Sequence, residues 1–98
     1  MKFYPNTVTL AAKHLGGWCV HVDVECDSTE VFVTLAEAVK EHLPDPEPLF
    51  QVLVGGMFHF DTEKEAWQFF EIFNTPPIYA SCISAALYHN GDPIDENT

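Results

Sequence analysis

The sequence predicts an α+β fold in a single domain, in which an antiparallel sheet carries two helices on one face. Residues 18–26 alternate apolar and polar side chains, as a half-buried strand does. Residues 28–43 and 62–74 repeat apolar side chains with a helical period, each directly after a capping sequence. A chain of 98 residues with 47% hydrophobic content is large enough for one modest core. We therefore expect residues 1–98 to fold as one domain, with a loose tail at 91–98.

The segment "TVTLAAKHLGG", residues 7–17, precedes the alternating strand, and we interpret it as the hairpin partner of that strand. A bulge or a longer loop at Gly16-Gly17 would set the register that places three side chains on the core face: Val8, Leu10 and Ala12. The alternative is a short helix capped by Asn6.

The strand itself reads "WCVHVDVEC". Its apolar face consists of Trp18, Val20, Val22, Val24 and Cys26. The other face carries Cys19, His21, Asp23 and Glu25, and we expect it to be solvated.

The first helix is predicted within "CDSTEVFVTLAEAVKEHLP", residues 26–44, where Asp27, Ser28 or Thr29 can cap its start. The core stripe is Val31, Leu35, Val39 and Leu43, widened by Phe32 and Ala36. The opposite face carries Glu30, Thr34, Glu37 and Glu41. The prolines of "PDPEP", residues 44–48, end the helix and predict a stiff, exposed acidic connector.

The second unit repeats this pattern: "LFQVLV" at 49–54, Gly55-Gly56 and "MFHF" at 57–60 predict a second hairpin. Thr62 and Glu65 form a capping box for a helix that runs to about Asn74. Its core stripe is Ala66, Phe69, Phe70 and Phe73.

The segment "IYASCISAALYH", residues 78–89, fits either period, and we predict a strand that closes at an Asn90-Gly91 turn. The element order is then ββα-ββα-β. Without its first segment this order is β-α-β-β-α-β, the ferredoxin-like arrangement. Both Gly-Gly pairs would supply positive φ angles at hairpin tips.

The charge balance is the most unusual property of the chain. Fifteen acidic residues face four lysines, the net charge is −11, and the sequence contains no arginine. We expect no direct binding of nucleic acid, because such a chain repels polyanions and lacks the guanidinium groups that hold phosphates. The same field attracts a basic protein surface, although acidic charge also serves solubility alone.

No motif in the chain names a reaction. Three cysteines without CxxC spacing are typical of reduced thiols, and zinc-ligand types occur at spacings that match no zinc signature: His14, Cys19, His21, His59 and Cys82. Neither Gly-Gly pair belongs to a phosphate-binding loop. We therefore expect no catalytic residue, cofactor or metal. With no bilayer-length apolar run and no secretory signal, we expect a cytoplasmic protein.

Two features of the predicted helices point outward. Trp67 and Ile72 lie off the second core stripe beside glutamates, which indicates either a wider buried arc or an aromatic anchor for a basic partner. Glu37 and Glu41 continue a line of charge towards Asp45, which is either a solvated face or a row that imitates phosphates. The predicted contact residues are Asp23, Glu25, Glu37, Glu41, Glu63, Trp67 and Glu71.

The acidic segments "DVECDSTE", "EHLPDPEPLF" and "FDTEKEAWQFFE" give the chain a general character similar to that of small acidic phage-encoded accessory proteins. That group includes anti-CRISPR proteins and DNA-mimic inhibitors. The resemblance implies stoichiometric binding to a nucleic-acid-handling protein of the host cell cytoplasm, with its basic channel occupied. The resemblance lies in overall composition and not in an alignable motif, and it supplies no site residues.

The sequence therefore predicts a non-enzymatic binding protein that inhibits or modulates a basic, nucleic-acid-handling partner. One alternative is an assembly module that acts as a homodimer. Another is a small metal-binding enzyme built on His21, Asp23 and a cysteine.

Overall fold

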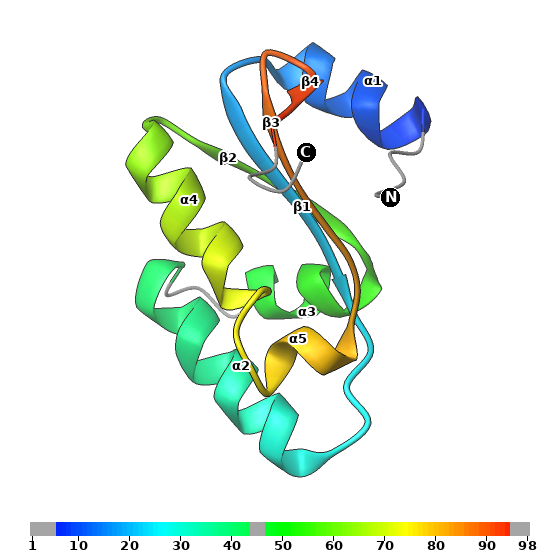
Figure 1. The fold of residues 1–98 in the computed structure, drawn as a ribbon, viewed down its shortest axis with the longest axis vertical. Helices are drawn as coiled ribbons and strands as arrows, with labels where there is room; N and C mark the ends of the chain where they lie inside the picture. The colour runs from blue at the N-terminus through cyan, green and yellow to red at the C-terminus, as the bar shows by residue number, and fades with distance from the viewer. Residues whose placement is uncertain (1–5, 44–46, 95–98) are drawn as a thin grey trace.

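The structure is a computed structural model that describes residues 6–43 and 47–94. These residues form five helices and four strands, whose arrangement Figure 1 shows. In chain order they are α1 (Asn6–Leu15), β1 (Trp18–Val24), α2 (Thr29–His42), α3 (Glu47–Val54), β2 (Gly56–Phe60), α4 (Glu63–Ile72), α5 (Ile78–Ser81), β3 (Cys82–His89) and β4 (Asp92–Pro93).

The four strands form one antiparallel sheet in the order β2-β1-β3-β4. The central strand β1 pairs along its length with both neighbours, so that Val20 lies opposite Phe58 of β2 and Leu87 of β3. The predicted alternation of β1 is confirmed, since Val20, Val22 and Val24 are buried. The α+β class and the antiparallel sheet are thus as the sequence predicts.

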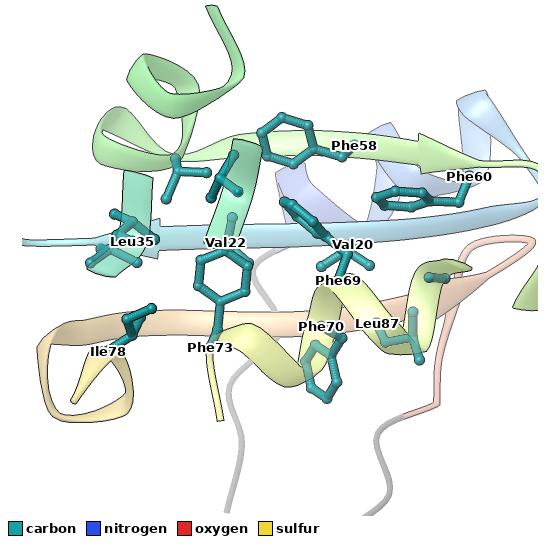
Figure 2. Close-up of a cluster of buried hydrophobic side chains, with 14 residues drawn as sticks. Val20, Val22, Leu35, Phe58, Phe60, Phe69, Phe70, Phe73, Ile78 and Leu87 are labelled. Atoms are coloured by element: carbon teal, nitrogen blue, oxygen red, sulfur yellow. The ribbon is translucent and has the colours of Figure 1, made fainter. Parts of the chain in front are cut away.

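The main core lies between one face of this sheet and the helices α2, α3, α4 and α5. Figure 2 shows Phe69 of α4 pointing at the sheet beside Val20. Its ring centroid is 5.1 Å from that of Phe58 and 5.2 Å from that of Phe60. Buried aromatic pairs at such distances add about 0.5–1.5 kcal/mol each to the burial of their surface.

A second, smaller core lies on the opposite face of the sheet, under α1 (Figure 1). Ala12 of α1 is buried there against Cys19, Ala86 and Tyr88. The polar face of β1 is therefore solvated only in part: Cys19 is fully covered, while His21 and Asp23 are half-buried. Helices lie on both faces of the sheet, and not on one face as the sequence predicts.

The strand prediction for residues 7–15 is wrong, because this segment is the helix α1. Val8 and Ala12 are one helical turn apart and both face the sheet, whereas Leu10 is 66% exposed. The amide of Gly16 donates to the carbonyl of Ala12 at 3.0 Å, and Gly16 then leaves the helix with a φ of 68°. A glycine with positive φ is a common helix C-terminus.

The second predicted hairpin is also wrong in its first strand, because residues 47–54 form the helix α3. Val52 is fully buried, and Leu49 and Leu53 pack against the same core at helical spacing. Pro48 is tolerated because it lies in the first turn, where an amide has no helical partner. Residues 44–46 of the predicted connector lie outside the described residues.

The repeated sequence pattern therefore encodes helix, Gly-Gly, strand, cap and helix, where we predicted two hairpins. Gly16, Gly17 and Gly55 have the predicted positive φ angles and Gly56 does not, and both pairs join a helix to a strand. The ββα-ββα-β order and the ferredoxin-like arrangement are accordingly not observed. The two leading helices also differ in placement, since α1 and α3 lie on opposite faces of the sheet.

Both predicted helix starts are confirmed. The Ser28 hydroxyl accepts from the amide of Val31 at the start of α2. At α4, the Thr62 hydroxyl accepts from the amide of Glu65 and donates to its carboxylate, which completes the capping box. Both predicted stripes are buried, although Leu43 is half-buried and Phe32 of α2 is 42% exposed.

The strand predicted within residues 78–89 is confirmed over Cys82–His89 as β3, but residues Ile78–Ser81 form the short helix α5 instead. Asn90 and Gly91 both have positive φ and form the turn into β4. The amide of Ile94 donates to the carbonyl of Leu87 at 2.8 Å. The loose tail expected from residue 91 therefore does not begin there, and residues 95–98 lie outside the described residues.

Candidate functional site

A groove of about 280 Å³ lies between α2 and α4, beyond the edge of the main core. Thr34 and Ala38 line it from α2, and Glu71 and Ile72 line it from α4. Ile78, the first residue of α5, closes its apolar floor. Figure 1 shows α2 and α4 next to each other on the same side of the sheet.

The helical period explains why α2 presents charge beside this groove. Val31, Leu35 and Val39 turn into the core, so the flank of α2 that carries Thr34 and Ala38 faces α4. Glu37 follows Thr34 by three residues and Glu41 follows Ala38 by three, which places both along the outer edge of that flank. Both glutamates are exposed.

We call Glu71, which lines the groove, and the exposed Glu37 and Glu41 of α2, which do not line it themselves, the acidic rim. Among the described residues, none of these carboxylates forms an ion pair. The hydroxyl of Thr75 donates to the backbone carbonyl of Glu71 at 2.8 Å, so it leaves the carboxylate unoccupied. Of the seven predicted contact residues, Glu71 lines the groove, and Glu37 and Glu41 lie on the helix that forms its other wall.

Glu63 and Trp67 lie on α4 but outside the groove. The indole N–H of Trp67 donates to a Glu63 carboxylate oxygen at 3.2 Å. The ring is half-buried, with its centroid 5.7 Å from that of Phe70 in an edge-on contact. Trp67 therefore belongs to the border of the core, which matches the wider buried arc and leaves little of the ring for a partner.

Asp23 and Glu25 lie away from the groove. Asp23 is half-buried on the sheet face opposite to α4, near Gly55. Glu25 is exposed just after β1, and its amide donates to the carbonyl of Ser81. The sequence placed these two residues with the others because they share a strand face, but the sheet itself separates Asp23 from the acidic rim.

The groups of the alternative enzyme hypothesis do not share one face of the sheet, since His21 and Asp23 alternate with the buried valines of β1, whereas Cys26 and Cys82 pack against the main core. Burial lowers the pKa of His21, and the Asp23 carboxylate opposes part of that shift. Burial, followed by the charge of Asp23, raises the pKa of the Cys82 thiol to about 11. Burial likewise raises the pKa of Cys19, and burial with Asp27 nearby raises that of Cys26. Protonated thiols are poor nucleophiles, so the raised pKa values argue against an activated nucleophile at Cys19, Cys26 or Cys82.

In residues 6–43 and 47–94, no group of three or more His, Cys, Asp or Glu side chains is placed to hold a metal ion. No helix in the same residues is long and apolar enough to cross a membrane.

The groove itself is a feature that the sequence did not predict. Its apolar lining comes from residues separated in the chain, with Ala38 on α2 and Ile72, Pro76 and Ile78 at the other wall and floor. One signal was present: Ala38 is a small side chain beside the buried stripe, and a small residue there leaves space next to a neighbouring helix. The "TPPI" segment was interpreted only as a helix end.

Comparison with protein-family models, with curated proteins and with solved structures finds no significant match for this chain.

Proposed function

We propose that this protein is a non-enzymatic acidic binding protein whose α2–α4 side docks on the basic surface of a nucleic-acid-handling protein and inhibits or modulates it. The observation that carries the proposal is the distribution of charge. The exposed carboxylates gather on α2, α4 and the residues directly before them, where they outnumber the exposed Lys40 and Lys64: Asp27, Glu30, Glu37, Glu41, Asp61, Glu63, Glu65 and Glu71. Glu25 stands apart from them, because its amide continues the pairing of β1 by donating to the Ser81 carbonyl.

The opposite side of the molecule is different in charge. Among the described side chains there, Asp92 is the one exposed carboxylate, and α1 presents Lys13 and His14. A net charge of −11 spread evenly would serve solubility alone, whereas a one-sided distribution creates a directed field. Such a field orients the molecule as it approaches a basic surface and raises the association rate.

The groove lies on the same side of the molecule as the acidic helices, which favours this side as the contact surface. Charge speeds the encounter, but slow dissociation needs contacts that exclude water. The apolar lining at Ala38, Ile72 and Ile78 provides such a contact in the same groove as Glu71 of the acidic rim. The absence of arginine means that the protein itself contributes no guanidinium contact to nucleic acid.

The proposal is tested by affinity capture from the native cell with three immobilised proteins. These are the wild type, the rim variant Glu37→Lys/Glu41→Lys, and a matched control, Glu25→Lys/Asp92→Lys, with the same change in net charge. We expect one partner to be retained by the wild type and the control, lost by the rim variant, and displaced by duplex DNA. Equal retention by both variants, or a partner that DNA does not displace, would overturn the proposal.

A second candidate is self-association through α3, favoured by two exposed apolar side chains. Phe50 and Val54 are 66% and 80% exposed and lie one turn apart on the same helix. Sedimentation of the wild type and of Phe50→Ser over a range of concentrations tests it. A dimer that Phe50→Ser dissociates would support this candidate, and a wild type that stays monomeric would exclude it.

A further inference from the structure

The groove between α2 and α4 combines an apolar floor with a charged edge. Ala38, Ile72 and Ile78 form its apolar surface, and the exposed Glu71 stands at its mouth. Thr34 adds one hydroxyl on the α2 side. Both the chemistry and the size of this groove restrict what it accepts.

The size fits one side chain. Ligand pockets for small molecules measure about 300–1,000 Å³, so the 280 Å³ of this groove lies below that range. A side chain that projects from a folded or extended partner segment is a better match than a free metabolite.

The chemistry selects a cationic side chain with an aliphatic stem. An anionic side chain is repelled by Glu71 and by the net charge of −11. A purely apolar side chain covers the apolar lining but makes no favourable electrostatic contact with the Glu71 carboxylate. Lysine and arginine place their methylene groups on an apolar surface while their charged ends remain near water.

The Glu71 carboxylate is available for such a contact. The hydroxyl of Thr75 bonds to the backbone carbonyl of Glu71, and the Trp67 indole bonds to Glu63. Among the described residues, no hydrogen bond or ion pair engages the Glu71 carboxylate.

We infer that the groove receives one arginine or lysine side chain of a basic partner segment. The methylene stem of that side chain lies on Ala38, Ile72 and Ile78, and its charged end meets Glu71, with Glu37 and Glu41 nearby. The inference rests on the proposed function, and it adds the type of partner side chain that the groove binds.

The test is a titration of ¹⁵N-labelled protein with three blocked peptides of the form Gly-Gly-X-Gly-Gly, where X is arginine, lysine or citrulline. Citrulline has nearly the shape of arginine but carries no charge. We expect saturable shifts of the amide signals of Thr34, Ala38, Glu71 and Ile72 with arginine and lysine, and clearly weaker binding with citrulline. Equal shifts with citrulline, or shifts confined to carboxylates outside the groove, would overturn the inference.

Two variants locate the contact. Gln68 is exposed and lines the groove, so Gln68→Phe fills it without a change in charge, and we expect affinity for the arginine peptide to fall about tenfold or more. Glu71→Gln should lower the affinity about threefold, as loss of an exposed ion pair does. The control Glu25→Gln should leave it unchanged.

The amide spectrum of each variant reports whether its fold is intact, and Ala38→Leu fills the same groove from α2 if Gln68→Phe disturbs the fold. The captured partner then separates this inference from the proposed function. Retention by the groove-filled variant and loss by Glu37→Lys/Glu41→Lys would refute the groove and leave the proposed function standing. Retention by both variants would refute the two together.

Discussion

The indole of Trp18 lies flat against the imidazole of His89, with ring centroids 4.0 Å apart and ring planes inclined by 13°. The two residues are direct cross-strand neighbours at the ends of β1 and β3. Asn90 continues the contact, because its side-chain oxygen accepts from the amide of Gly17 at 2.9 Å and its amide donates to the Gly17 carbonyl. These contacts join the α1–β1 connection to the β3–β4 turn.

The stack between Trp18 and His89 should contribute to stability. We expect His89→Ala to lower the free energy of unfolding by about 0.5–1.5 kcal/mol, the usual range for an aromatic pair. Urea denaturation followed by circular dichroism measures this change. The emission of Trp18, recorded in a Trp67→Phe background, should also change because its stacking partner is lost. An unaltered spectrum together with unaltered stability would contradict the observed stack.

Two glycines with the same backbone requirement should differ in their response to alanine. Gly91 has a φ of 89°, and a Cβ there would lie 2.7 Å from the Lys13 Cβ and 2.8 Å from its Cα. Gly16 has a φ of 68° and nothing within 4 Å of such a Cβ. Gly16→Ala should therefore cost about 1–2 kcal/mol, for left-handed backbone alone.

Gly91→Ala should cost clearly more than Gly16→Ala, since α1 must also move away from the turn. Thermal unfolding of the two variants side by side checks the order. Equal losses would show that the turn and α1 are not in close contact.

The capping box at α4 gives a prediction with a conservative control. Thr62→Ala removes the hydroxyl that accepts from the amide of Glu65, and should destabilise the protein by about 1 kcal/mol. Thr62→Ser keeps that hydroxyl and should change stability by much less than Thr62→Ala does. If both variants lost the same stability in urea, the hydroxyl would not be the stabilising group.

His21 predicts a pH dependence of stability. Burial holds its pKa below the ordinary value of 6.5, and Asp23 opposes part of the shift. The unfolded chain therefore binds the proton more readily than the folded protein does. The contribution of His21 to the free energy of unfolding is complete above pH 6.5 and is lost as the pH falls through the pKa of His21 in the folded protein.

His21→Gln should accordingly flatten the loss of stability below pH 6.5, measured as the free energy of unfolding at several pH values. Asp23→Asn removes the opposing charge and should lower the pKa of His21 further, which NMR titration of the imidazole protons reports. A pKa of His21 that rises in Asp23→Asn would contradict the stated balance.

The sequence predicted those elements in which period, cap and length agree. α2 and α4 have caps at Ser28 and Thr62 followed by apolar stripes, and β1 has strict alternation. α1 and α3 were misassigned because each is a short apolar run that ends in Gly-Gly. Such a pair is equally suited to a hairpin turn and to a helix C-terminus.

One signal could have identified α3. Leu49, Val52 and Leu53 have helical spacing, which leaves Phe50 and Val54 outside the core. A strand over the same residues would instead place Val52 on the same face as Phe50 and Val54.

The candidate site was predictable only in part. Glu37, Glu41 and Glu71 follow from the surface positions of two correctly predicted helices. Their common groove does not, because it depends on how closely α2 and α4 approach, which is a matter of tertiary packing. Asp23 lies on the face of the sheet opposite to α2 and α4, so the sheet separates it from the acidic rim.

The most direct test of the central claim, that the acidic rim is a contact surface for a basic partner, is the salt dependence of the association rate with the captured partner. Stopped-flow measurements compare the wild type, Glu37→Lys/Glu41→Lys and the control Glu25→Lys/Asp92→Lys. We expect the rate for the wild type and the control to fall about tenfold or more between low and physiological salt. The rim variant should start slower and respond to salt only weakly. Equally steep slopes for all three proteins would show that Glu37 and Glu41 do not guide binding, and would contradict the account.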